Sequence, residues 1–333
     1  MVPTEALPAD LTALTASRLS TAIRARAVSC REVMQAYLQR IHERNPVYNA
    51  IVSLRGDAEL LAEADVADRE LDQGHYRGWM HGMPHAVKDL ANVAGLPTSH
   101  GSPIFAGQLA KEDDLMVRRL RAAGAIFIGK TNTPEWGMGS QSYNPVFGAT
   151  GSACNPAWTA GGSSGGAASA LGAQLLPVAD GSDMMGSLRN PAAFNNVIGF
   201  RPSFGRVPTG GDGDLFYQQL AVAGPMGRTV ADTVRLLHTQ AGEDASAPLS
   251  LRDPLPAAEA FKAAPLNGLR VGWLGSYDGY LAMEPGVLER CESALTALAQ
   301  HGALIEPCQP RYDLARLWQT WLVLRHWQWQ KLL

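Results

Sequence analysis

The stretch "TAGGSSGGAASALGAQ", residues 159–174, decides the fold class. Two glycine pairs enclose Ser163 and Ser164, and a run of small residues follows them. Small residues at helical length favour a helix that can approach a sheet closely. A glycine-rich start of a helix also presents backbone N–H groups that can hold an anion. The stretch therefore predicts a small-residue helix packed on a sheet, with a serine loop at its start.

Apolar and amphipathic runs alternate on both sides of this stretch. We expect helices over residues 11–45, 57–73, 113–125, 229–242 and 285–303, and strands over residues 81–90, 125–130, 175–181, 195–203, 269–275 and 304–308. Strands that alternate with helices are typical of a sheet whose faces are covered. The pattern predicts an α/β fold with a largely parallel sheet.

Composition limits the classes of protein to which the chain can belong. Of its 333 residues, 46% are hydrophobic and only 18% are charged, below the usual quarter, which favours one large domain over two small ones. A net charge of −3 argues against a nucleic-acid partner. The chain lacks the ~18-residue apolar run that spans a bilayer, and its N-terminus does not resemble a signal peptide. We expect a cytoplasmic protein without a membrane partner.

The four cysteines do not indicate a metal or redox site. Cys30, Cys154, Cys291 and Cys308 form no CxxC pair. A chain of this length does not need disulfide bonds to stabilise its core. We therefore expect no metal and no cofactor.

The segment "GAIFIGKT", residues 124–131, matches the phosphate-loop pattern GxxxxGK[ST] but not its physics. A phosphate loop presents backbone N–H groups from a turn between a strand and a helix. The variable positions here are Ala, Ile, Phe and Ile, which belong inside a strand, and Pro134 disfavours a long helix directly afterwards. We predict a buried strand from which Lys130 points toward the surface, and no ATP site.

The last segment of the chain predicts an apolar helix face. Leu314, Leu317, Trp318, Trp321 and Leu322 are spaced as i, i+3, i+4, i+7 and i+8. We interpret the segment as a core helix, because its polar face lacks the lysine-rich stripe of a membrane-surface helix. A core helix needs a partner and the chain ends soon afterwards, so we expect that part of the C-terminal region is missing.

Three stretches carry groups that can do chemistry together. Lys88 ends the apolar run of "GMPHAVKDL" (82–90), Ser163 lies between glycine pairs, and Ser187 lies in "SDMMGSLRNP" (182–191), which has no regular periodicity. One helix and one strand separate the two serines, so both can reach one site. Each piece alone has an ordinary structural interpretation: a surface lysine, a flexible linker or a turn serine.

Together these stretches resemble the amidase signature family. Its motifs stand here as "GMPHAVKDL", "GKTNTPEWG", "GGSSGGAASALGA" and "GSDMMGSLRNPAAFNNVIGFRPSFGRVP". The resemblance implies a large mixed, mostly parallel β-sheet covered by helices on both faces. It implies a single amidase domain over residues 1–333, with an N-terminal helical region (1–80), a signature core (81–210) and a partial C-terminal region (211–333). Family members generally continue well beyond this C-terminus.

The resemblance also assigns roles to single residues. It implies that Ser187 is the nucleophile, that Ser163 is the bridging serine after a cis Gly162–Ser163 peptide bond, and that Lys88 is the base. A lysine is a base only when neutral, and burial lowers its pKa because desolvation disfavours the ammonium. His85 is close to Lys88 in sequence, but strand neighbours three apart face opposite sides, so it offers no competing arrangement.

The residues before the nucleophile are expected to form an oxyanion hole from the backbone N–H groups of Met184, Met185, Gly186 and Ser187. The family usually has two glycines where this chain has Met185 and Gly186. If that position needs a positive φ, Met185 would be strained. Otherwise its side chain should narrow the pocket or line its apolar wall.

Other residues of these motifs have expected roles as well. Asp183 and Arg189 should hold the nucleophile loop through hydrogen bonds rather than touch substrate. Gly137, Met138 and Gly139, which end and follow "GKTNTPEWG", are candidate substrate-binding residues.

The resulting prediction is an amidase that hydrolyses a carboxylic amide through an acyl-enzyme on Ser187. Its partner is a small-molecule amide, and a homodimer is left open as an assembly. One alternative is the glutaminase subunit of a tRNA-dependent amidotransferase, against which Met185 and the chain length argue. Another is a truncated, catalytically inactive family member, although Lys88, Ser163 and Ser187 are all present.

Overall fold

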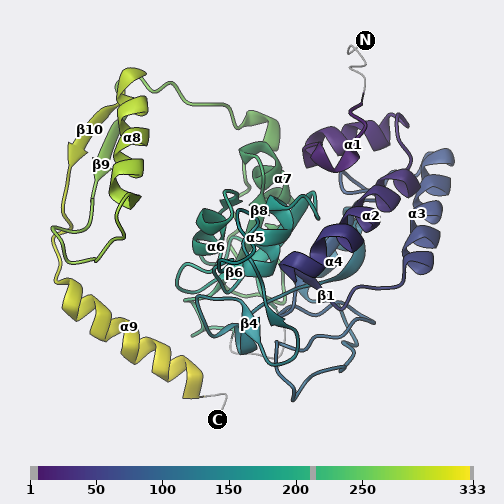
Figure 1. Cartoon of the computed structure of the whole chain (residues 1–333), viewed down its shortest axis with the longest axis horizontal. Coiled ribbons are helices and arrows are strands. Elements are labelled where there is room, and N and C mark those ends of the chain that lie inside the picture. The colour runs from purple at the N-terminus through teal and green to yellow at the C-terminus, as the bar shows by residue number, and fades with distance from the viewer. Residues whose placement is uncertain (1–6, 211–214, 331–333) are drawn as a thin grey trace. The chain divides into compact units, whose positions relative to one another are not determined.

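The computed structural model describes residues 7–210 and 215–330 of the chain. These residues fall into two compact units, Met1–Phe261 and Lys262–Leu333. Both units combine helices with strands (Figure 1), so the predicted α/β class is confirmed. The assignment of residues 1–333 to a single domain stays a prediction.

The first unit contains most of the secondary structure. Its helices are α1 (Ala16–Arg24), α2 (Cys30–Tyr48), α3 (Asp57–Asp72), α4 (Leu115–Ala122), α5 (Gly165–Gly172), α6 (Arg189–Phe194) and α7 (Val230–Gln240), with short 3-10 turns η1 (Leu11–Ala13), η2 (Glu135–Gly137) and η3 (Ala258–Ala260). Its strands are β1 (Ile51–Val52), β2 (Pro84–Lys88), β3 (Ile126–Thr131), β4 (Tyr143–Asn144), β5 (Gly148–Ala149), β6 (Val178–Asp183), β7 (Ile198–Gly199) and β8 (Val222–Gly227).

The strands of the first unit form mixed ladders. One sheet has the order β1-β3-β2, in which β2 and β3 are parallel and β1 is antiparallel. Another has the order β6-β8-β7, in which both ladders are antiparallel. Strand β2 also contacts β6. The carboxyl end of β2, at Lys88, therefore lies beside the strand that leads to Ser187.

Helix α5 is the small-residue helix that the sequence predicts, and it packs on the β1-β3-β2 sheet. The helix packs so closely that Gly165 and Gly166 have no room for a side chain. A Cβ on Gly166 would lie 2.2 Å from the backbone nitrogen of Asn132 and 2.6 Å from the carbonyl oxygen of Ala50. A Cβ on Gly165 would lie 2.4 Å from Oγ of Ser142. Larger residues would push the helix and its serine loop off the sheet.

The first unit differs from the sequence-based expectation in several places. The helix expected over residues 11–45 is divided into η1, α1 and α2. Helix α2 runs past residue 45 to Tyr48, because Pro46 lies in the last turn, where its missing N–H removes only one helical bond. Strand β8 was not expected from the sequence "VAGPMG", since its proline and glycines weaken the strand pattern. It is nevertheless the central strand of its sheet.

The second unit has the expected strands and helices: β9 (Arg270–Trp273), α8 (Val287–Gln300), β10 (Leu304–Pro307) and α9 (Leu314–Trp329). Strands β9 and β10 pair in parallel, with α8 between them in the chain. Leu317 and Trp318 of α9 are 51% and 46% exposed among the described residues, so the interpretation of α9 as a core helix with a missing partner stays a prediction. Among the described helices, none is both long and apolar enough to cross a membrane.

Candidate active site

Lys88 is buried at the end of β2 and surrounded by hydroxyl groups. Its side chain is only 2% exposed. Nζ lies 2.8 Å from Oγ of Ser163, 2.8 Å from Oγ of Ser164 and 3.0 Å from Oγ of Ser182. The sequence motifs pointed to the contact with Ser163. They missed the contacts of Ser164 and Ser182 with Lys88, although both serines lie inside the quoted motifs.

The protonation of Lys88 follows from this burial. Desolvation lowers the pKa of Lys88 from its ordinary 10.5 to about 7, although the charges of Asp180 and Asp183 act in the opposite direction. At neutral pH a large fraction of the amines is therefore uncharged. A neutral amine can accept a proton from a hydroxyl within hydrogen-bond distance.

The loop that carries Ser163 is fixed by its neighbours. The Gly162–Ser163 peptide bond is cis. A Cβ on Gly162 would lie 2.9 Å from the backbone nitrogen of Gln141, so the loop has no room for a side chain there. The Ser142 hydroxyl donates to the Ser163 carbonyl at 3.3 Å and accepts the Gly165 N–H at 3.0 Å. Ser142, which the sequence motifs did not single out, thus ties two loops together.

Ser187 lies beside the same loop. Its carbonyl oxygen accepts the backbone N–H of Ser164 at 3.2 Å, and its side chain is half-buried. Residues that are far apart in the sequence, Lys88, Ser163 and Ser187, are therefore gathered at one place. The direct contact in this group is between Lys88 and Ser163.

The loop that carries Ser187 is held by Asp183, as expected. The buried Asp183 carboxylate accepts the N–H groups of Gly186 at 2.7 Å and Leu188 at 3.1 Å, and it pairs with the Arg189 guanidinium at 3.0 Å. Burial alone would raise the pKa of Asp183, but Arg189 and the two N–H groups outweigh burial and keep it below the usual range. The loop is thus closed around an ionised carboxylate.

This arrangement corrects one part of the expected oxyanion hole. The Gly186 N–H is already donated to Asp183 and so is not free for a substrate oxygen. Within the described residues, the N–H groups of Met184, Met185 and Ser187 have no hydrogen-bond partner. They remain the candidate donors.

The two methionines fit the loop without backbone strain. Nine described non-glycine residues have positive φ, and neither Met184 nor Met185 is among them. The positive φ falls on Gly186 instead, at +107°, where a Cβ would also lie 2.7 Å from the Asn190 amide. The Met185 side chain is 53% exposed. Glycine is thus required at 186 but not at 185.

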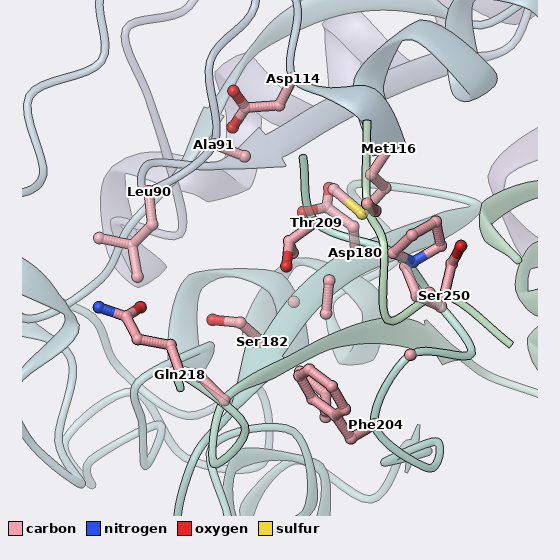
Figure 2. A pocket seen from close by; sticks show the side chains of 18 of the residues that line it. Leu90, Ala91, Asp114, Met116, Asp180, Ser182, Phe204, Thr209, Gln218 and Ser250 are labelled. Carbon is pink, nitrogen blue, oxygen red and sulfur yellow. The ribbon is translucent and has the colours of Figure 1, made fainter. Parts of the chain in front are cut away.

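Two cavities are lined by residues of the motifs described above. Lys88, Asp180 and Ser182 are in the wall of a cavity of about 430 Å³, whose lining side chains are drawn in Figure 2. Met138 and Gly139 line a second cavity of about 470 Å³. Further residues of the second wall include Trp136, Gln141, Tyr143 and Asn144.

Gly137 is not in the wall of this second cavity. It packs beside Leu90, where a Cβ would lie 2.6 Å from Cδ1. Of the three candidate substrate-binding residues, the structure therefore places Met138 and Gly139, but not Gly137, at a cavity.

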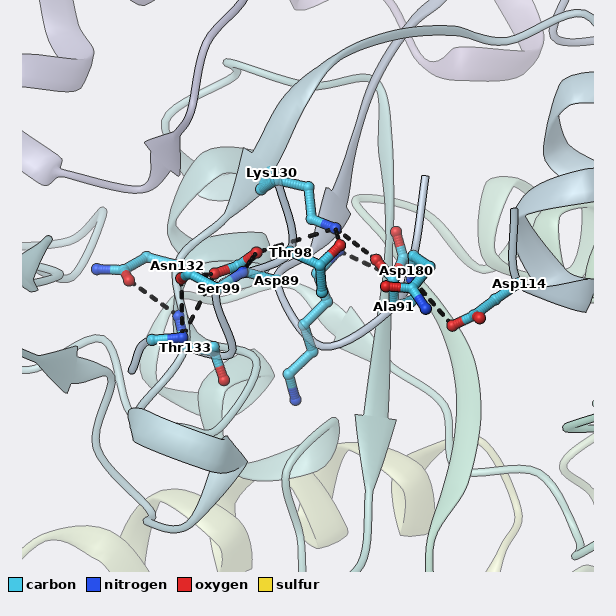
Figure 3. Close-up of polar contacts among 12 residues, drawn as sticks. Asp89, Ala91, Thr98, Ser99, Asp114, Lys130, Asn132, Thr133 and Asp180 are labelled. Carbon is cyan, nitrogen blue, oxygen red and sulfur yellow. Dashed lines mark hydrogen bonds and ion pairs between the residues drawn. The ribbon is translucent and has the colours of Figure 1, made fainter. Parts of the chain in front are cut away.

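A second lysine near the site is buried, in contrast to the expectation that it points to the surface. Lys130 is fully buried in β3, and its Nζ donates to the Ala91 carbonyl and to Thr98 Oγ1, 3.1 Å away (Figure 3). Burial lowers the pKa of Lys130, and Asp89, at 3.9 Å, opposes the effect. The error arose because the segment that contains Ala91 and Thr98 covers the strand end, which a local pattern does not reveal.

Known proteins resemble this chain over most of its length. It is 38% identical to an acylamidase of Rhodococcus erythropolis over 300 residues, which are 90% of this chain and 62% of that protein. It is 37% identical over 308 residues to a glutamyl-tRNA(Gln) amidotransferase subunit of Acidothermus cellulolyticus, covering 92% of this chain and 60% of that protein. The chain thus spans about three fifths of the length of these curated relatives.

Solved structures agree with this resemblance. A bacterial aryl acylamidase of the amidase signature family superposes with a TM-score of 0.84 at 28% identity, covering 92% of this chain and 64% of that one. The peptide amidase from Stenotrophomonas maltophilia superposes with a TM-score of 0.78 at 34% identity, covering 91% and 63%. The family model described as Amidase matches residues 32–325. The chain belongs to the amidase signature family.

Proposed function

We propose that the protein hydrolyses the C–N bond of a linear carboxylic amide through an acyl-enzyme on Ser187. The observation that carries this proposal is the buried Lys88 amine, 2.8 Å from Oγ of Ser163, in a loop that contacts Ser187. Lysine at this depth supplies a base near neutral pH, which a serine nucleophile needs. The family membership supports amide chemistry as the reaction class.

The proton relay accounts for both halves of the reaction. Ser187 Oγ attacks the carbonyl carbon, its proton passes to Ser163 Oγ, and the Ser163 proton passes to Lys88 Nζ. When the tetrahedral intermediate collapses, the C–N bond breaks, Ser163 gives its proton to the leaving nitrogen, and Lys88 returns a proton to Ser163. Water then attacks the ester on Ser187 by the same relay, which releases the carboxylic acid and the free serine.

We place the oxyanion of the intermediate against the backbone N–H groups of Met184, Met185 and Ser187. One donor of this kind contributes about 2.7–4 kcal/mol to transition-state stabilisation. The Asp183 carboxylate supports them indirectly, because it fixes the loop through Gly186 and Leu188. We assign the cavity that contains Met138 and Gly139 to the substrate.

The named relatives bear on the substrate class. An acylamidase and an aryl acylamidase favour simple acyl amides for this chain. We propose a small-molecule amide as the partner and the cytoplasm as the location.

A glutaminase belonging to an amidotransferase is the second candidate, because the amidotransferase relative is about as similar to this chain as the acylamidase is. The two candidates predict different substrates. A glutaminase releases ammonia from glutamine and co-purifies with partner subunits, whereas an acylamidase hydrolyses acyl amides alone.

The test is hydrolysis of a panel of aliphatic, aryl and peptide amides, with glutamine included, by wild type and by the Ser187→Ala variant. Intact-mass measurement after a brief reaction should show an acyl adduct on wild type and none on the variant. Ser169→Ala is the matched control, because Ser169 is a buried serine of α5 whose hydroxyl donates to the Gly151 carbonyl and not to Lys88. Wild-type protein that forms no adduct and hydrolyses none of the panel would favour the inactive family member instead.

A further inference from the structure

A histidine and an aspartate form a buried pair next to Lys88. His85 Nε2 lies 3.0 Å from Asp180 Oδ1, and the two side chains are 0% and 1% exposed. The other oxygen, Oδ2, accepts the backbone N–H of Lys88 at 3.2 Å. In β6, side chains alternate, so Asp180 faces the same side as Ser182, whose hydroxyl contacts Lys88 Nζ. The His85–Asp180 pair thus lies among the residues that surround Lys88.

The position of His85 agrees with the alternation expected along β2, because no hydrogen bond joins His85 to Lys88 among the described residues. Both residues bond Asp180 instead, His85 through its ring and Lys88 through its backbone N–H. His85 therefore acts on Lys88 through the Asp180 carboxylate and not by direct contact.

Packing alone does not account for this pair. A buried polar pair stabilises a fold little compared with apolar side chains of the same volume. The second ring nitrogen of His85, Nδ1, is buried without a partner among the described residues. An unsatisfied buried polar atom costs stability. The ring packs edge-on to Phe127, at 6.2 Å between centroids, as an apolar ring would.

Few charges act on Lys88. Asp180 raises the pKa of Lys88 more than Asp183 does, and the Asp183 carboxylate is shared with Arg189 and Arg201. On the neighbouring strand β3, Lys130 is 3.9 Å from Asp89.

Two other titratable groups complete the surroundings. Asp114 is in the wall of the same cavity as Lys88 and accepts the N–H of Asn92. His85 acts through its bond to Asp180. Removal of the Asp180 charge should therefore change the electrostatic potential at Lys88 more than removal of the Asp183 charge would.

We propose that the His85–Asp180 pair is a positioning element that sets the pH range in which Lys88 acts as a base. Asp180 fixes the backbone of Lys88 and places a negative charge beside it, and His85 orients that carboxylate. Burial without this charge would lower the pKa of Lys88 further and make the amine a weaker base. A weaker base accepts a proton less readily from the Ser163 hydroxyl. The part of this proposal that concerns activity rests on the proposed amide hydrolysis.

The first test measures Lys88 directly. The chain has only five lysines, so lysine labelled with ¹³C at Cε gives a simple NMR spectrum, and Lys88→Met identifies the Lys88 signal. In Asp180→Asn, Lys88 should titrate about one pH unit lower than in wild type, because an opposite charge at this range shifts a pKa by roughly 1–3. Asp114→Asn, in the same cavity wall, is the control and should leave the curve in place. Superimposed curves for wild type and Asp180→Asn would overturn the proposal.

The second test measures activity. The acid limb of the kcat/KM–pH profile should lie about one unit lower in pH for Asp180→Asn than for wild type. At a pH on this limb, the variant should therefore reach a fraction of its own plateau rate that is up to about tenfold larger than in wild type. A purely structural role would lower the plateau and leave the limb in place. If the NMR curve moves but neither protein hydrolyses amides, the proposed function fails and the role of the pair stands.

A measurement on wild type alone keeps the proposal testable if Asp180→Asn does not fold. The Asp180 carboxyl carbon should keep the chemical shift of a carboxylate through the whole range in which Lys88 titrates. A protonated Asp180 in that range would show that the pair carries no charge, and the proposal would be wrong.

Discussion

Replacing Lys88 by methionine should stabilise the fold while it abolishes activity. The two side chains have similar volume, so the change mainly removes an amine from a buried site. In the unfolded chain Lys88 titrates near 10.5, whereas burial lowers its pKa to about 7 in the folded protein. A difference of about 3.5, at about 1.4 kcal/mol for each pH unit, means that the buried amine costs ~5 kcal/mol at pH 7.

The gain is smaller than this cost because methionine cannot bond the surrounding hydroxyls. Ser163, Ser164 and Ser182 each lose a partner, at about 1 kcal/mol apiece. We therefore expect Lys88→Met to raise the free energy of unfolding by about 2 kcal/mol at pH 7.

The pH dependence of the difference is the sharper test. Between about pH 7 and 10.5 the unfolded wild-type chain binds one more proton than the folded protein, so wild-type stability rises with pH and the variant lacks this rise. The advantage of Lys88→Met should shrink by about 1.4 kcal/mol per pH unit and change sign near pH ~8.5. Urea unfolding of both proteins across this range measures it, with Lys111→Met, at an exposed lysine, as the control. Parallel stability curves for wild type and Lys88→Met would refute the reasoning.

Three further outcomes are expected. Below pH 7, kcat/KM should fall about tenfold per pH unit as the Lys88 amine is protonated, and Lys88→Arg should be nearly inactive at every pH, because arginine stays charged; substantial activity in that variant would remove Lys88 as the base. Met185→Gly should widen the range of acyl groups, with shifts of roughly 10–200-fold in relative kcat/KM across a series of rising bulk; identical profiles would mean that Met185 points away from substrate. Gly166→Val should destabilise the fold by more than about 3 kcal/mol in thermal unfolding, since its Cβ would overlap Asn132; an unchanged midpoint would contradict the packing of α5.

The parts of the structure that local pattern determines were predictable. The small-residue helix, the strand that ends at Lys88 and the amphipathic helices follow from residue types within one window. Strand β8 was not predictable in this way, because Pro225 and the flanking glycines lower its intrinsic preference, and pairing on both edges overrides that preference. The burial of Lys130 likewise depends on a segment more than thirty residues away in the sequence.

The candidate site, like the fold, was predictable from local sequence patterns only in part. The motifs pointed to Lys88, Ser163 and Ser187, but not to the partners that complete their surroundings. The bond from Gly186 to Asp183 depends on how a loop folds back on itself, and the contact of His85 with Asp180 depends on the placement of β6 beside β2. Neither can be read from spacing along the chain.

The hydroxyl of Ser142 has a consequence for how substrate range and turnover are connected. It joins the loop that lines the Met138 cavity to the loop that carries Ser163, because it donates to the Ser163 carbonyl and accepts the Gly165 N–H. If this cavity holds the substrate, as we propose, a substrate bulky enough to displace the first loop should also move Ser163. A change of cavity size should then alter kcat as well as KM.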